Sequence, residues 1–319
     1  MMRVRSILAL AALLALPIVS PARAGVAETC DRACLSGHVD RYLEAMVAHD
    51  PKRLPLAKGV KFTENGQRMD LGDGLWATVK GLRDYRFHFN DVTTGQAGAM
   101  ALVQENDHPA LMSVRLRIRG GRITEVETIV SRGDAAASLK IDGLQDKPIF
   151  AEALAPADRR SRQAMVGTVK DYLNALIVTR KQGDLFDVDC TRVENGVRTA
   201  NNPAATDRLG KMNCGDQLDT GASEMLTRVR EPRFLMVDEE RGLVHVVMFF
   251  DHASTKLSAT AHFKDGATQA MTAHNQQPYS FMCAEVFKLK GGKVRQIEVT
   301  LLSVPYRMLS GWPAAPDAS

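Results

Sequence analysis

Thr63-Glu64-Asn65-Gly66 is the clearest sign of an internal repeat, because its last three residues return 130 positions later as Glu194-Asn195-Gly196. The residues around it also return in order. Tyr42, Leu43 and Ala45 recur as Tyr172, Leu173 and Ala175; Leu71, Gly74, Arg86, Phe87 and Asp91 recur at an offset of 147; Asp107-His108 recurs at 144 as Asp251-His252; Gly120-Gly121 and Glu127 recur at 171 as Gly291-Gly292 and Glu298. This ordered self-similarity predicts two tandem copies of one domain.

The changes of offset locate two insertions in the second copy. About 17 extra residues separate Gly196 from Leu218, and 27 extra residues separate His252 from Gly291. Loops of that length inside a compact domain are usually functional or disordered. We therefore expect the copies to differ in role, with the second copy the more ligand-gated half.

Residues 1–24 are typical of a secretory signal peptide. Arg3 and Arg5 precede the apolar run 7–18, and Ala22-Arg23-Ala24 provides small residues for cleavage. The run is too short to span a bilayer as a stable helix. We expect a secreted or periplasmic protein with no membrane span after cleavage.

Composition argues against several classes of partner. Without residues 1–24 the chain has 38 Lys+Arg (41 − 3) against 37 Asp+Glu. Because nucleic-acid-binding proteins usually carry an excess of basic residues, this balance argues against nucleic acid as a partner. No zinc-finger spacing, His-Glu-x-x-His helix, phosphate loop, dinucleotide fingerprint or Gly-x-Ser-x-Gly elbow occurs. We expect no metal and no cofactor.

The five cysteines of the mature chain form an odd set. Export permits disulfides, and a bridge between Cys190 and Cys214 would hold the first insertion to the core. Cys30 and Cys34 bracket the start of a helix and could also pair. Cys283 lies in an apolar strand and is interpreted as a buried hydrophobe rather than a nucleophile.

Each copy is expected to be α+β. A helix with apolar positions 39, 42, 43, 46 and 47, repeated over Met165–Val178, precedes a short strand, a second helical stretch and four long strands that close at a Gly-Gly hairpin. Helices would then cover one face of a curved antiparallel sheet. The expected domains are 25–133 and 161–319, joined by a connector over 134–160.

This pattern resembles the SnoaL-like branch of the nuclear transport factor 2-like superfamily. The resemblance rests on the inward helix tyrosine, Thr63-Glu64-Asn65-Gly66, Gly72-Asp73-Gly74-Leu75-Trp76 and the closing hairpin. It implies two cone-shaped domains, each a bent sheet around a long helix with an apolar pocket at its open end. Members include isomerases, dehydratases, polyketide cyclases and cofactorless lyases, while others only bind or assemble, so fold does not settle function.

Residues shared by both copies have two readings. Tyr42 and Tyr172 could each donate a hydrogen bond to a substrate oxygen, as family members do from this helix, or could be core tyrosines. Glu64 with Asn65, and Glu194 with Asn195, could move a proton and hold a substrate at a pocket edge. Because Asn-Gly is also a common tight-turn pair, a structural role is the safer interpretation there.

Residues found in only one copy are better functional candidates. In the first copy these are Trp76, Tyr85 and His88, with Arg86 and Asn90 on the face of His88; the alternative is a surface histidine. In the second copy they are His245, Tyr279 and Glu285. Tyr279, Phe281, Cys283, Glu285 and Phe287 alternate onto one face, where apolar neighbours would raise the pKa of Glu285. The alternative is a Glu paired with an Arg across the sheet.

The leading hypothesis is a cofactor-independent lyase or isomerase, for example a dehydratase, acting on a small hydrophobic hydroxylated or aromatic molecule. The alternative is a non-catalytic binding or docking module. Polar groups inside a cone would favour the enzyme, and a filled interior would favour a scaffold. We further expect the copies to pack as an internal pseudo-dimer, with further oligomerisation left open.

Overall fold

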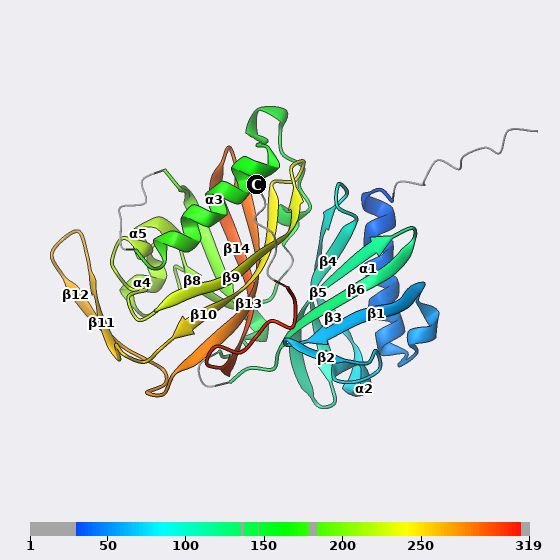
Figure 1. Ribbon diagram of the computed structural model, residues 1–319. Helices are drawn as coiled ribbons and strands as arrows, with labels where there is room; N and C mark the ends of the chain where they lie inside the picture. Colours follow the sequence, from blue (N-terminus) through cyan, green and yellow to red (C-terminus); the bar gives the residue numbers. More distant parts are fainter. Residues whose placement is uncertain (1–29, 135–136, 146, 179–183, 314–319) are drawn as a thin grey trace, which may run out of the picture.

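The computed structural model of the chain describes residues 30–134, 137–145, 147–178 and 184–313. The expected signal peptide lies outside these residues. No helix within the described ranges is long and apolar enough to cross a membrane. Figure 1 shows two curved sheets side by side, each with its own helix.

The first copy is built from α1 and a six-stranded sheet. Its elements are α1 (Arg32–Val47), the 3-10 turn η1 (Pro51–Arg53), β1 (Leu56–Glu64), β2 (Gln67–Met69), α2 (Leu75–Thr78), β3 (Val79–Asp91), β4 (Gln96–Glu105), β5 (His108–Arg119) and β6 (Arg122–Ser131). The strand order is β2-β1-β6-β5-β4-β3. Asp31 caps α1 by accepting a hydrogen bond from the backbone N–H of Cys34.

The described part of the connector between the copies holds three 3-10 turns: η2 (Ile141–Gly143), η3 (Pro148–Phe150) and η4 (Pro156–Asp158). The second copy then repeats the plan of the first with additional elements. They are α3 (Arg162–Ala175), β7 (Phe186–Glu194), β8 (Val197–Ala200), α4 (Arg208–Lys211), α5 (Cys214–Leu218), β9 (Arg228–Asp238), β10 (Leu243–His252), β11 (Ser258–His262), β12 (Thr268–Thr272), β13 (Tyr279–Lys290) and β14 (Lys293–Pro305).

The two sheets have the same topology. The second is ordered β8-β7-β14-β13-β10-β9, and β1 pairs parallel with β6 just as β7 pairs parallel with β14. All other pairings in these sheets are antiparallel. The predicted α+β fold with two tandem copies is therefore confirmed, although each sheet is mixed rather than wholly antiparallel.

The strand register corrects one equivalence read from the sequence. Glu105 pairs with His108 in the first copy, and His252 pairs with Tyr279 in the second. The equivalent of His252 is thus Glu105, and matching Asp107-His108 with Asp251-His252 was wrong. The offset between equivalent residues therefore stays at 147 to the end of β10, and the second insertion adds 24 residues (171 − 147). These residues form the β11–β12 hairpin at the left edge of Figure 1.

Four of the apolar clusters in the described residues lie against the two six-stranded sheets, and a smaller fifth joins α4 to the β11–β12 hairpin. One layer lies between α1 and the first sheet and another between α3 and the second. The other two lie where the sheets face each other and include Phe89, Phe150 and Phe249. Phe150 of the connector is fully buried and stacks on Phe87 with ring centroids 4.4 Å apart. The copies therefore share a core as well as a chain.

Ion pairs cross the junction between the copies in a reciprocal pattern. Arg32 at the start of α1 pairs with Asp238 at the end of β9, and its equivalent Arg162 pairs with Asp91, the equivalent of Asp238, at 2.8 Å. A symmetric interface makes the same contact twice. A third pair, Arg233 with Glu127, is buried at the centre of the junction.

Candidate functional site

The second copy contains a cavity of about 570 Å³ between α3, the concave face of its sheet and both insertions. This volume falls in the range of small-molecule sites. Polar side chains at its base come from α3, β7 and β13, and aromatic side chains come from the far ends of β10 and β13. The lining residues used below are Tyr172, Arg192, Glu194, Gln217, Ser223, His252, Met271, His274, Tyr279, Phe281 and Glu285.

Glu285 is the most unusual group in the cavity. Its side chain projects from β13 and the residue is 2% exposed; among the described residues, its Oε2 atom has no hydrogen-bond partner. Burial, reinforced by the neighbouring Glu194 carboxylate and opposed by Arg192, raises its pKa to about 8. A carboxyl group in this state can donate a proton near neutral pH and accept one when ionised.

Arg192 organises the polar base of the cavity. Its guanidinium pairs with Glu194 at 2.7 Å, donates to Thr199 Oγ1 at 3.0 Å and hydrogen-bonds Gln217. Burial raises the pKa of the Tyr172 phenol, which also interacts with Arg192. The phenol therefore stays protonated and can donate a hydrogen bond. Together these groups form a donor set beside the Glu285 carboxyl group.

Aromatic side chains and the two insertions form the other end of the cavity. His252 stacks on Tyr279 with centroids 4.6 Å apart and planes at 6°, and Phe281 meets both rings edge-on. Met271 of β12 and His274 come from the hairpin insertion, and Gln217 comes from α5 of the first. The loops that distinguish the second copy thus lie at its cavity.

Smaller side chains in the second copy take the place of large ones that fill the interior of the first. Trp76 is 1% exposed, donates a hydrogen bond from Nε1 to Tyr42 Oη at 2.8 Å and fills the interior there. At the offset of 147, its equivalent is Ser223, and that of Leu75 is Ala222; both small residues line the cavity. The equivalent of Glu285, set by the strand register, is the apolar Val114.

The shared candidates of the first copy have structural partners. Glu64 Oε2 accepts a hydrogen bond from the Leu75 backbone N–H at 2.8 Å, and Arg132 pairs with Oε1. Asn65 adopts a left-handed conformation and bonds the N–H and C=O of Val130. Asn195 does the same with Leu301. These asparagines tie the turn to the neighbouring strand in both copies.

The remaining candidates lie away from the cavity. His88 and Arg86 face α1 and contact Asp40 at 2.9 and 3.5 Å. Tyr85 donates to Glu298 Oε1 at 2.9 Å across the junction between the copies. His245 stacks on Phe89 in that junction, where burial, with Arg115 and Arg233, lowers its pKa to about 3. The cavity thus brings together Tyr172, Glu194, Tyr279 and Glu285. Of the other candidates, it excludes Tyr85, Arg86, His88 and His245.

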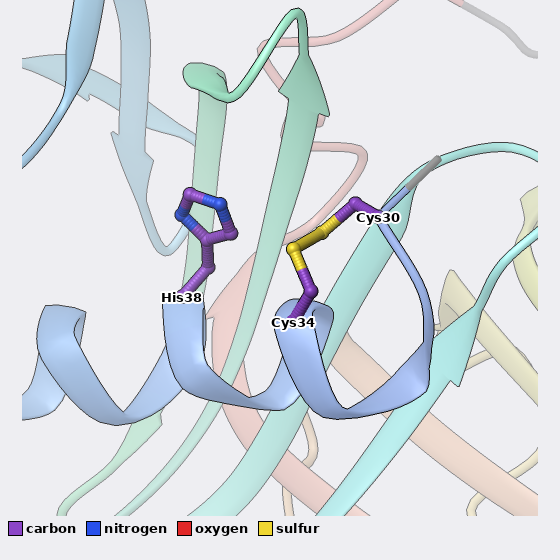
Figure 2. Close-up of side chains that lie close together, drawn as sticks. All are labelled: Cys30, Cys34 and His38. Atoms are coloured by element: carbon purple, nitrogen blue, oxygen red, sulfur yellow. A yellow bond between two sulfur atoms is a disulfide. The ribbon is translucent and has the colours of Figure 1, made fainter. Parts of the chain in front are cut away.

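Two disulfides are present, as predicted. Cys190 of β7 is bonded to Cys214, the first residue of α5, and so holds the first insertion beside the cavity. Figure 2 shows the second bridge, Cys30–Cys34, beside the ring of His38 on α1. The possible ligand atoms of these three side chains lie within 4.8 Å of one another, close enough to hold a metal ion. Because metal ligation requires thiolates, the disulfide removes two of the three donors.

Sequence reasoning missed several cavity residues, among them Arg192 and Ser223. The signal for both was the repeat itself. Arg192 stands where the first copy has Phe62, and Ser223 stands where it has Trp76. Trp76 occurs in one copy only, and its absence from the other copy marks the position of the cavity.

Comparison with known proteins identifies the family. The model of the family described as Domain of unknown function (DUF8021) matches residues 28–130 and 158–301. The chain belongs to the DUF8021 family. The two matched segments coincide with the two copies in the structure. No curated protein matches this DUF8021 chain.

Several solved structures resemble parts of the DUF8021 chain. An NTF-2 like protein of unknown function from Burkholderia xenovorans LB400 is 14% identical over 31% of this chain and 84% of its own, with a TM-score of 0.27. A candidate polyketide cyclase from Silicibacter sp. TM1040 is 20% identical over 30% of this chain and 88% of its own, with a TM-score of 0.24. A phenazine biosynthesis-related protein from Pseudomonas aeruginosa is 13% identical over 48% of this chain and 90% of its own, with a TM-score of 0.25.

Proposed function

We propose that the second copy is a cofactor-independent lyase or isomerase acting on a small hydrophobic hydroxylated or aromatic molecule, and that the first copy supports it. The observation that carries the proposal is Glu285: a buried carboxyl group at the base of a cavity, one of whose oxygens has no hydrogen-bond partner among the residues that the structure describes. Desolvated titratable groups in cavities are favoured sites of proton transfer. The chain would belong to the SnoaL-like branch in this interpretation.

The residues suit a proton relay. Ionised Glu285 would take a proton from a substrate carbon beside a carbonyl group, and Tyr172 and Arg192 would stabilise the negative charge on the carbonyl oxygen by donating hydrogen bonds. In an isomerase, Glu285 would return the proton to another carbon. In a dehydratase, it would give the proton to the departing hydroxyl group, which leaves as water and regenerates the carboxylate. Neither of these two reactions needs a further reactant.

The second candidate is a carrier of the same class of ligand. It is favoured by the stacked His252–Tyr279 pair with Phe281, which offers flat apolar surface suited to an aromatic ring whether or not chemistry follows. For either candidate we infer export to the periplasm or the medium, since disulfides such as Cys190–Cys214 persist in oxidising compartments.

A thermal-shift screen separates these candidates. The chain would be heated with hydrophobic phenols, steroids, polyketide-like aromatics and lignin-type dimers, and each stabilising compound would then be examined by chromatography. A ligand raises the melting temperature by mass action. A stabilising compound that is converted without added cofactor, by the wild type but not by Glu285→Gln, supports the enzyme. Recovery of every such compound unchanged contradicts catalysis and favours the carrier.

A further inference from the structure

A second hollow, of about 640 Å³, lies on the opposite side of the second sheet, between that sheet and the connector. Its walls carry five cationic side chains against two carboxylates, and apolar side chains lie between them. The cations are Lys147, Arg198, Lys288, Lys290 and Arg295, the acids are Glu152 and Asp158, and the apolar residues include Pro148, Ile149, Leu154 and Val193.

Lys288 is the unusual cation of this set. It is 2% exposed, and its ammonium group donates to the Glu152 backbone carbonyl at 2.7 Å. Within the described residues no carboxylate forms an ion pair with it. An ammonium group has three N–H donors, so Lys288 keeps donors for a ligand. Burial lowers its pKa to about 8, which is the direction expected for a cation without a close anionic partner.

The repeat shows what has been lost from this position. The strand register makes Arg117 the first-copy equivalent of Lys288 and Glu125 the equivalent of Gln296. In the first copy, Arg117 pairs with Glu125 at 3.2 Å across two neighbouring strands. In the second copy the cation is kept and the acid is replaced by a neutral amide. Both Lys288 and Gln296 line the hollow.

We propose that this hollow binds an organic anion: an oxyanion group, carboxylate or phosphate, held by Lys288, Gln296 and Arg198, with an apolar body against Ile149 and Leu154. Cationic donors bind such oxyanions by charge-assisted hydrogen bonds. The site is separate from the Glu285 cavity, because Lys288 and Glu285 project from opposite faces of β13.

Calorimetric titration of the full chain with phenyl phosphate, benzoate and inorganic phosphate tests the proposal. We expect saturable binding of phenyl phosphate or benzoate, with the tighter of the two identifying the oxyanion, and weaker binding of inorganic phosphate. Gln296→Glu restores the acid of the first copy without removing a cation and should weaken binding by roughly tenfold or more. Lys288→Met should do the same.

Three controls make the result specific. Lys58→Gln removes one positive charge from an exposed site in the first copy and should leave binding unchanged, as should Ser223→Trp in the Glu285 cavity. Lys288→Arg should retain binding. The proposal is overturned if neither organic anion binds saturably, if Lys58→Gln weakens binding as much as Gln296→Glu, or if Ser223→Trp abolishes it.

Discussion

At the scale of single residues, Glu285 combines two properties that a structural role does not require. It is buried at the base of a cavity, and the neighbouring Arg192 pairs with Glu194 rather than with Glu285. Glu127 shows the contrast. Burial alone would raise the pKa of Glu127, but Arg233 and Arg115 together lower it. One buried carboxylate is thus held ionised by its partners, while the other favours its protonated form.

The raised pKa of Glu285 predicts a stability difference that depends on pH. Between the ordinary value of 4.5 and about 8, the folded protein retains a proton that the unfolded chain releases, so the free energy of unfolding falls as pH rises through this window. Glu285→Gln removes that loss. We expect the variant to match the wild type at pH 4 and to be more stable at pH 8, by on the order of a few kcal/mol.

Urea unfolding at both pH values measures the difference. Glu44→Gln, an exposed change on α1, is the control and should show no such dependence. A Glu285→Gln variant with the same stability relative to wild type at pH 4 and pH 8 would mean that the carboxyl group is already ionised in the folded state.

At the scale of elements, the insertions build the cavity onto a shared frame. The β11–β12 hairpin takes the place of the two-residue link Asn106-Asp107 and supplies Met271, Ala273 and His274 to the lining. The first insertion supplies Gln217 and is held by the Cys190–Cys214 disulfide. The frame itself is the same in both copies.

Removal of the hairpin should therefore abolish binding and spare the fold. Replacing residues 253–278 with Asn-Asp joins β10 to β13 as β4 is joined to β5. We expect a folded chain whose stabilisation by cavity ligands is lost, because one wall of the cavity is gone. Melting curves with and without ligand provide the measurement. Undiminished stabilisation of the truncated chain would show that the hairpin is no part of the site.

Much of this frame could be predicted from sequence, because the repeat and the alternation of apolar residues report backbone pairing directly. The same alternation placed Glu285, Tyr279 and Phe281 on one face. The concave face of each sheet could not be identified from the sequence, because apolar side chains cover both faces. For that reason Tyr85 and His245 were selected as site residues, although they lie between the copies.

At the scale of the whole molecule, the two copies depend on each other through the Arg233–Glu127 pair. Both side chains are about 97% buried or more. Removing Arg233 takes away one of the two cations that compensate the buried Glu127 charge, while Arg115 still contacts Glu127 at 3.2 Å. The strand register places Arg233 opposite Val247 as Phe87 lies opposite Met100. Arg86 of the first copy is a surface contrast, since its pair with Asp40 is 39% exposed on both sides.

These two arginines form a matched test of the junction. Arg233→Met should lower the free energy of unfolding by about 1.5–3 kcal/mol, the range for a hydrogen bond to a charged group, whereas Arg86→Met should cost about 0–1 kcal/mol because exposed ion pairs are screened by solvent. Chemical unfolding of both variants provides the comparison. Equal effects would show that the central pair does not hold the copies together.

We propose that Ser223, standing where the first copy has Trp76, leaves room for a ligand in the second copy. The most direct measurement is ligand-induced stabilisation of the Ser223→Trp variant, which restores the first-copy residue in the cavity, beside that of Trp76→Ser. Ser223→Trp should lose stabilisation by the hydrophobic phenols, steroids and aromatics that stabilise the wild type, and Trp76→Ser, although less stable, should retain it. Retained stabilisation by these compounds in Ser223→Trp, or its loss in Trp76→Ser while that variant remains folded, would show that residue 223 does not control the cavity.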